Sequence, residues 1–225
     1  MTSTHPDTSQ AKNTAQAGGM SEVEDSVEVE GQVPPPGSLE AEGRLPMPGG
    51  AGAGLADTAL GDSPATSPRA AVRLVELLKA RRATVATAES LTGGLVGAAL
   101  TDIPGVSAVY RGGVVVYATD LKATLAGVPA DLLADLGPVH ADTAAALASG
   151  VRERLGATYG LATTGVAGPD PQAGIEAGTV YVAAAGPEAV KVRKLALSGD
   201  RATVRQGSVQ AALELAVELV TEELA

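Results

Sequence analysis

The chain has 225 residues, a formal net charge of −10, no cysteine and two histidines, His5 and His140. The missing cysteines exclude a disulfide framework, a thiolate nucleophile and a Cys-type zinc site, and two histidines leave little room for a multi-His metal centre. The negative charge argues against nucleic acid or anionic lipid as a partner, and the lack of an 18-residue apolar stretch argues against a membrane span.

Residues 1–68 differ in composition from the rest of the chain. They carry ten acidic residues against two basic ones, 8 of the 14 prolines and no aromatic residue. Such a segment cannot bury enough apolar surface to offset the entropy lost on ordering. We therefore expect a disordered acidic Pro/Gly-rich tail over 1–68, either solvated or docking a protein partner, and one folded domain over 69–225. The start of the chain shows no secretory leader, so the expected location is cytoplasmic.

Hydrophobic periodicity in the domain predicts alternating helices and strands. Helices are expected over 70–82, 92–101, 119–126, 129–136, 141–155 and 200–224, and strands over 84–88, 112–117, 158–163, 179–185 and 190–197. Helices separate the first three strands, whereas a Gly-Pro turn at 186–187 joins the last two. This order predicts a three-layer α/β fold on a mostly parallel sheet with one antiparallel strand.

Candidate site residues follow the predicted strands, because open α/β sheets bind ligands beyond the carboxyl ends of their strands. Ser90 precedes a helix whose free N–H groups favour negative charge, so it is a candidate nucleophile or phosphate ligand, or a simple N-cap. Tyr117 and Lys122 follow the strand over 112–117, and either could accept the serine proton, although Lys122 could also be an ordinary surface lysine. His140 precedes a predicted helix, and we interpret it as a capping or loop residue.

Two further segments lie near predicted strand ends. Residues 163–170 form a glycine-punctuated loop that would let the backbone approach a ligand closely. Arg201 lies in the first turn of the last helix, where the helix dipole disfavours a cation. We expect Arg201 to bind an anion such as a phosphate, or else to pair with Asp200 or a neighbouring acid.

Together these segments resemble the C-terminal domain of the CinA family of competence-damage-inducible proteins, a domain that also occurs alone as nicotinamide-nucleotide amidase. The shared motifs are Ala-Glu-Ser-Leu-Thr-Gly-Gly at 88–94, Gly-Val-Val-Val-Tyr at 113–117 with Lys122, Thr-Gly-Val-Ala-Gly-Pro-Asp at 164–170, Gly-Thr-Val-Tyr at 178–181 and Ser-Gly-Asp-Arg at 198–201. The resemblance covers about 70–224 and implies a three-layer α/β/α sandwich on a five-stranded mixed, mostly parallel sheet. The acidic tail stands where the family has a molybdopterin-binding-like domain.

The resemblance also implies an activity, the deamidation of nicotinamide mononucleotide to nicotinic acid mononucleotide and ammonia, without a metal or other cofactor. It makes Ser90 the nucleophile and leaves the division of labour between Tyr117 and Lys122 open. N–H groups around 92–94 or at Gly165 would hold the oxyanion, and Arg201 would contact the phosphate. The residues implied for substrate binding are Thr92, Gly93, Gly94, Thr164, Gly165, Gly168 and Arg201.

The sequence departs from the family pattern in several places. Leu91 stands where many relatives have Cys, Thr164 where Ser is common, and Pro-Val-His-Ala at 138–141 where Ala-Val-Ser-Glu is usual. Ile-Glu-Ala at 175–177 replaces a Lys-Pro-Val type of sequence, which puts the identity of the amide substrate in question. A non-catalytic nucleotide-binding or regulatory module linked to competence or DNA damage is the alternative function. The oligomeric state stays open, since the apolar stripe of the last helix suits a core or a homo-oligomer interface.

Overall fold

The computed structural model describes residues 68–223, so the tail expected over 1–68 lies outside the described residues except for Pro68. The elements, in chain order, are α1 (Pro68–Arg81), β1 (Val85–Glu89), α2 (Leu95–Thr101), the 3-10 turn η1 (Val106–Ala108), β2 (Tyr110–Val115), α3 (Thr119–Thr124), α4 (Ala130–Leu136), α5 (Ala141–Arg154), β3 (Tyr159–Gly165), β4 (Thr179–Ala185), β5 (Val190–Ala196) and α6 (Arg201–Glu222). None of the described helices is long and apolar enough to cross a bilayer.

One five-stranded sheet, in the order β2-β1-β3-β4-β5, forms the centre of the domain. β1 pairs in parallel with β2 and with β3, and β4 is antiparallel to both of its neighbours, β3 and β5. Four strands therefore run in one direction and β4 runs against them. This arrangement confirms the predicted mixed sheet with a single antiparallel strand.

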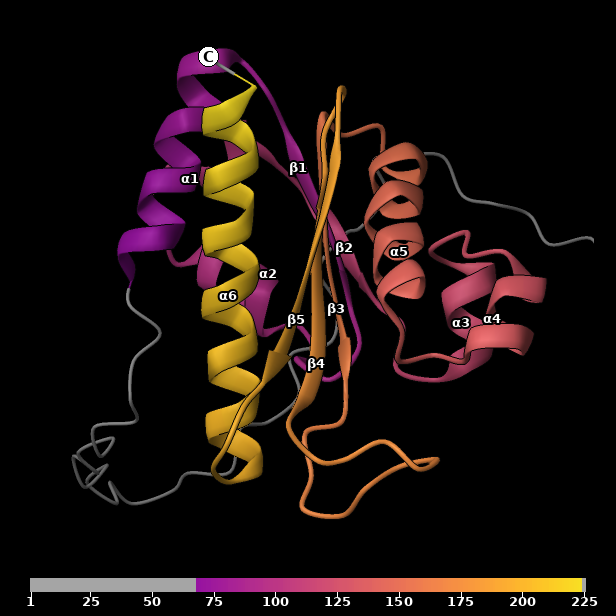
Figure 1. Cartoon of the computed structure of the whole chain (residues 1–225). Coiled ribbons are helices and arrows are strands. Elements are labelled where there is room, and N and C mark those ends of the chain that lie inside the picture. The colour runs from indigo at the N-terminus through magenta and orange to yellow at the C-terminus, as the bar shows by residue number, and fades with distance from the viewer. Residues whose placement is uncertain (1–67, 224–225) are drawn as a thin grey trace, which may run out of the picture. The chain divides into compact units, whose positions relative to one another are not determined.

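Helices cover both faces of the sheet, so the domain has three layers (Figure 1). α1, α2 and α6 lie on one face, and α3, α4 and α5 lie on the other. Each face buries its own apolar cluster, because successive side chains of a strand point to opposite faces. Val85 and Leu161 join the cluster beneath α1 and α6, whereas their neighbours Ala86 and Ala162 join the cluster beneath α5. The expected α/β/α sandwich is thus confirmed.

Most element boundaries differ from the sequence expectation by one or a few residues, and two of these differences affect the site. The helix expected from residue 92 begins at Leu95, because Gly93 and Gly94 have positive φ angles of 61° and 99° and form a turn. The strand expected over 112–117 ends at Val115, so Tyr117 lies beyond its ladder. Each shift lengthens the segment between a strand and its following helix.

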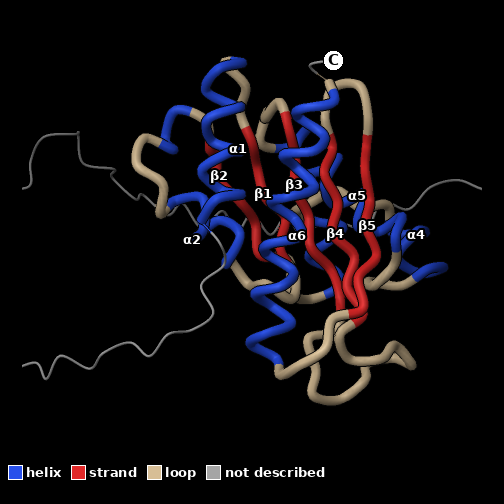
Figure 2. The backbone as a smooth tube through the Cα atoms, turned by 60° about the vertical axis from the view of Figure 1, so that its left-hand side comes forward, coloured by secondary structure: helices blue, strands red, loops and turns tan. Residues whose placement is uncertain are grey.

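The loops that could hold a ligand gather at one end of the sheet, as Figure 2 shows. Because β1, β2 and β3 are mutually parallel, their carboxyl ends share one edge. The connection from β3 to β4, residues 166–178, extends beyond the same edge (Figures 1 and 2). The topology therefore brings together segments that are far apart in the sequence.

The middle of α5 passes so close to the backbone after α3 that only glycine fits. A Cβ at Gly150 would overlap the carbonyl oxygen of Ala126, whereas a Cβ at Gly207 in α6 would meet only the flexible side chain of Leu197, at 3.2 Å. We predict that Gly150→Ala lowers the free energy of unfolding by about 1–3 kcal/mol. Gly207→Ala should change it by less than about 1 kcal/mol, since alanine favours a helix over glycine. Urea unfolding followed by circular dichroism measures both, and equal effects would contradict the close contact.

Candidate active site

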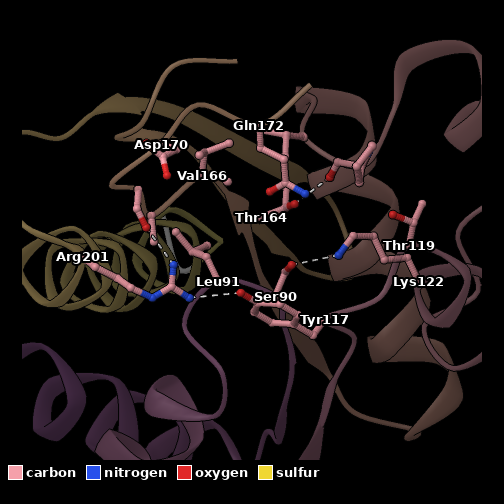
Figure 3. A pocket seen from close by; sticks show the side chains of 15 residues that line it. Ser90, Leu91, Tyr117, Thr119, Lys122, Thr164, Val166, Asp170, Gln172 and Arg201 are labelled. Atoms are coloured by element: carbon pink, nitrogen blue, oxygen red, sulfur yellow. Dashed lines mark hydrogen bonds between the residues drawn. The ribbon is translucent and has the colours of Figure 1, made fainter. Parts of the chain in front are cut away.

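A pocket opens where the strand ends and loops converge (Figure 3). It is lined by Ser90, Leu91, Tyr117, Thr119, Lys122, Pro138, Val139, Thr164, Gly165, Val166, Ala167, Gly168, Asp170, Gln172 and Arg201. These residues come from the loop after β1, the segment that leads into α3, the segment before α5, the β3–β4 loop and the start of α6. Seven of the ten site residues named from the sequence thus line one pocket.

Ser90 and Lys122 are in direct contact in this pocket. Nζ of Lys122 donates a hydrogen bond to Oγ of Ser90 at 2.9 Å and another to the carbonyl oxygen of Val116 at 2.7 Å. The lysine side chain reaches inward from α3 and is only 1% exposed. The bond to Val116 holds the amine beside the serine, because Val116 belongs to the short segment between β2 and α3.

Burial lowers the pKa of Lys122 from 10.5 to about 8, because an ammonium ion loses its hydration there. Within residues 68–223, no carboxylate pairs with this ammonium group within 4.0 Å to offset the loss. At pH 7 about a tenth of such lysines are neutral. A neutral amine can accept the Ser90 proton, so the contact has the geometry and the proton affinity of a nucleophile and its general base.

Tyr117 lies at the mouth of the pocket rather than against the serine bond. Its side chain is 62% exposed, and its hydroxyl accepts a hydrogen bond from Nη2 of Arg201 at 3.0 Å. Nη1 of Arg201 donates to the carbonyl oxygen of Gly168 at 3.0 Å, so this arginine links α6, the β3–β4 loop and the segment before α3 (Figure 3). Of the two candidate bases left open by the sequence, Lys122 is the one in contact with Ser90.

The alternative expectation for Arg201, an ion pair with a nearby acid, does not match the structure. Among residues 68–223 this guanidinium makes no ion pair within 4.0 Å. Asp200 instead caps α6, where its carboxylate accepts the N–H of Thr203 at 2.8 Å. The guanidinium therefore faces the pocket mouth without an ion pair, while Asp170 lines the same pocket, and its donors can bind an anion.

Thr164 and His140 fix the segment before α5. The hydroxyl of Thr164, which is fully buried, donates to the carbonyl oxygen of Pro138 at 2.6 Å. His140 caps α5, with Nδ1 accepting the N–H of Asp142 at 3.2 Å, so the capping interpretation is confirmed. Pro138 lines the pocket, and the buried threonine therefore shapes the wall through its hydrogen bond.

Thr92, Gly93 and Gly94, which the resemblance implies for substrate binding, lie in the turn before α2. None of the three lines the pocket. The N–H of Gly93 donates to the carbonyl oxygen of Ser90 at 3.1 Å, and the N–H of Gly94 donates to Oε2 of Glu89 at 2.9 Å. The amides of Gly93 and Gly94 are thus already paired within the chain, with the Ser90 carbonyl and the Glu89 carboxylate.

The Leu91 amide follows Ser90 directly and is a second candidate for an oxyanion donor. It lines the pocket, and its N–H has no acceptor within residues 68–223. The bond from Gly93 N–H to the Ser90 carbonyl fixes the peptide plane that carries this N–H, because the peptide unit is planar. An N–H directly after the nucleophile is a common oxyanion donor.

Sequence reasoning missed two residues that shape the site, Glu89 and Arg205. The sequence pattern places Glu89 only at the end of a strand, although an acid just before a helix start is a usable signal. Arg205 donates from Nε to the carbonyl oxygen of Leu91 at 3.0 Å and from Nη2 to that of Thr92 at 2.8 Å. Arg205 lies one helical turn after Arg201. No pattern in the sequence shows which arginine faces the pocket mouth and which one bonds the loop carbonyls.

The acidic residues of the described part do not form a metal centre. Within residues 68–223, no three His, Asp or Glu side chains lie close enough to share a metal ion.

The altered segment 175–177 does not line the pocket. Ala177 instead lines an adjoining hollow, which shares Gly168 and Arg201 with the pocket. The departure from the family pattern therefore lies beside the pocket.

The depressed pKa of Lys122 makes its burial destabilising below pH 8, where the folded protein must bury the cation. We predict that Lys122→Met removes a penalty on the order of 3 kcal/mol, offset in part by the unpaired Val116 carbonyl. The variant should be at least as stable as the parent at pH 7, and its advantage should shrink between pH 8 and pH 10.5, where the folded lysine is neutral while the unfolded lysine still binds a proton. Urea unfolding across this range measures the difference, with the exposed Lys79→Met as control; a difference independent of pH would contradict the assignment.

The comparisons with known proteins agree on one family. The sequence profile of the CinA C-terminal domain matches residues 68–220. A CinA-like protein of Frankia casuarinae is 55% identical over 139 residues, which are 62% of this chain and 32% of that protein. A putative competence-damage inducible protein of Desulforamulus reducens is 50% identical over 133 residues, 59% of this chain and 32% of that protein. The chain thus spans about a third of the length of these curated relatives.

Solved structures show the same fold. The competence/damage inducible protein CihA from Agrobacterium tumefaciens is 34% identical, with a TM-score of 0.66 over 69% of this chain and 96% of that one. A CinA superfamily protein from Escherichia coli is 28% identical, with a TM-score of 0.67 over 70% of this chain and 92% of that one. The chain belongs to the CinA C-terminal domain family.

Proposed function

We propose that this chain hydrolyses the carboxamide of nicotinamide mononucleotide, giving nicotinic acid mononucleotide and ammonia, with Ser90 as the nucleophile. The observation that carries the proposal is the 2.9 Å contact between Nζ of Lys122 and Oγ of Ser90 in a buried setting. Family membership supports it, because the resemblance of the motifs implies the same reaction and the same serine. The motif residues Tyr117, Thr164 and Arg201 line the same pocket.

In the first half of the reaction the neutral amine of Lys122 takes the proton of the Ser90 hydroxyl, and Oγ attacks the carboxamide carbon. The carbonyl oxygen becomes negative and is stabilised by the Leu91 N–H. The intermediate collapses when the C–N bond breaks. The proton held by Lys122 passes to the departing nitrogen, so ammonia leaves and an acyl-serine remains.

In the second half, water takes the place of ammonia. Lys122 accepts a proton from the water as it attacks the acyl carbon, and then returns that proton to Oγ of Ser90 as the ester bond breaks. The carboxylic acid product leaves and the lysine is neutral again. A single base serves both halves because the same nitrogen lies beside the reacting oxygen and keeps a pKa near the working pH.

Arg201 is the group that supports a phosphorylated substrate. It lies at the pocket mouth with no ion pair in the described part of the chain, and its hydrogen bonds go to neutral groups, the Tyr117 hydroxyl and the Gly168 carbonyl. A phosphate can replace these partners with charge-assisted hydrogen bonds. The carboxamide would then lie beside Ser90 and the phosphate at the mouth, with the ribose between them.

A non-catalytic regulatory role is favoured by one observation, the names of relatives such as the putative competence-damage inducible protein of Desulforamulus reducens. A regulatory module would bind the mononucleotide saturably without releasing ammonia. The buried lysine argues for catalysis, because a binding site has no need of an uncompensated cation beneath its serine.

We predict that the purified protein releases ammonia from nicotinamide mononucleotide without added metal, and that Ser90→Ala lowers kcat at least about 1,000-fold. The loss follows because water alone cannot form the acyl intermediate. A coupled ammonia assay measures it, and the variant should still bind the mononucleotide in calorimetry. If Ser90→Ala turned over the mononucleotide as fast as the parent, the mechanism would be wrong. If both proteins bound it without turnover, the regulatory role would be favoured.

Arg201→Gln tests the phosphate contact. We expect the loss of one charge-assisted phosphate interaction to raise KM for the mononucleotide about 10- to 100-fold, with a smaller effect on kcat. Nicotinamide riboside, which lacks the phosphate, should be turned over equally poorly by the parent protein and the variant. If the variant raised KM equally for the mononucleotide and the riboside, Arg201 would not contact the phosphate.

A further inference from the structure

The carboxylate of Glu89 lies beneath the loop that carries Ser90. Glu89 ends β1 and is 2% exposed. It accepts four hydrogen bonds, to Oε2 from Thr92 Oγ1 (2.7 Å), Gly94 N (2.9 Å) and Val96 N (3.0 Å), and to Oε1 from Gly97 N (2.8 Å). These bonds tie the loop and the first turn of α2 to the residue that directly precedes the nucleophile.

The backbone on both sides of Ser90 is also fixed to the sheet. The carbonyl oxygen of Glu89 accepts the N–H of Val116 at 2.8 Å, and the N–H of Ser90 donates to the carbonyl oxygen of Thr163 at 3.0 Å. Val116 also accepts the bond from Lys122, so the nucleophile and its base share one frame. A displacement of the loop backbone therefore changes the distance between Ser90 Oγ and Lys122 Nζ directly.

Arg205 donates hydrogen bonds to carbonyl groups of the same loop, while Glu89 accepts hydrogen bonds from donor groups of that loop. The guanidinium bonds the carbonyl oxygens of Leu91 and Thr92, and the Thr92 hydroxyl bonds both Glu89 and the Thr163 hydroxyl, the latter at 2.7 Å. Two opposite charges from β1 and α6 thus fix the polar groups of one short turn. The loop has little freedom to move while Ser90 reacts.

We propose that Glu89 is a positioning residue, whose negatively charged carboxylate keeps Ser90 Oγ against Lys122 Nζ and holds the Leu91 N–H at the pocket. The inference rests on the proposed serine chemistry. It needs the carboxylate itself, because three of its four partners are backbone N–H groups that can only donate. If glutamine replaced Glu89, its amide NH₂ would face at least one of these N–H groups in either orientation, so the start of α2 would have to move.

The first test uses the variant Glu89→Gln. The control is Glu218→Gln, which also removes one carboxylate. Glu218 pairs with Arg193 of β5 in the parent protein and does not line the pocket. The readout is the rate at which a fluorophosphonate probe labels Ser90, followed by intact mass, together with kcat and KM for ammonia release. We expect labelling and kcat to fall about 10- to 100-fold in Glu89→Gln. KM should stay within about 2-fold, the pH midpoint of kcat near 8 should not move, and Glu218→Gln should match the parent.

A milder pair of variants covers the case in which Glu89→Gln does not fold. Thr92→Val removes one of the four donors without changing the size of the side chain, and Thr92→Ser keeps the hydroxyl. We expect slower labelling in Thr92→Val and recovery of most of the rate in Thr92→Ser. A purely stabilising role would lower the unfolding midpoint of both Glu89→Gln and Thr92→Val while each folded molecule labels at the parent rate.

The outcomes separate this inference from the proposed substrate. If the parent labels at Ser90 but releases no ammonia from the mononucleotide, the proposed function fails while the labelling rates still decide the role of Glu89. If folded Glu89→Gln, or folded Thr92→Val, labels and turns over like the parent, the inference is overturned. A shift in the pH midpoint would also overturn it, because Glu89 would then act on the proton affinity of Lys122 rather than on position.

Discussion

The burial of a lysine amine against a serine hydroxyl is the constraint on which the site depends. Lys122 is 1% exposed, and the groups that receive its hydrogen bonds are a hydroxyl and a carbonyl, neither of which carries a charge. The arrangement therefore opposes folding, and it persists because the rest of the domain compensates through two apolar clusters, one on each face of the sheet. The same desolvation brings the pKa of Lys122 down to about 8, where it can serve as a base.

Much of the fold could be predicted because its signals are local. Strands and helices alternate with clear periodicity, and the Gly-Pro turn at 186–187 marks the hairpin that gives the sheet its one antiparallel strand, β4. Parallel strands also share an edge for their carboxyl ends, so the order of elements alone is enough to bring Ser90, Tyr117 and Gly165 to one place. The α/β/α layers follow from the same order of elements.

The finer features of the site depend on contacts that leave no local signal. Nothing in the sequence shows that Arg201 faces the pocket mouth while Arg205, one turn later, holds the carbonyl groups after Ser90. The choice between Tyr117 and Lys122 is of the same kind, because it depends on how α3 is placed against the ends of the strands. The expected start of α2 is wrong because glycine can adopt either a helical or a left-handed backbone, and Gly93 and Gly94 both have a positive φ that a right-handed helix excludes.

The charges at the helix ends explain where an anionic substrate group can bind. The N-terminus of α2 is occupied by Glu89 and that of α6 by Asp200, so the amides that usually attract phosphate are already bonded to carboxylates of the chain. Arg201 is the exposed cation among the described lining residues of the pocket, so an anion at the mouth can bind this side chain. This placement keeps negative charge at the mouth and leaves the neighbourhood of Ser90 and Lys122 to a neutral group such as a carboxamide. The exposed Arg201 and the buried Lys122 thus both support the proposed substrate, a neutral amide on an anionic carrier.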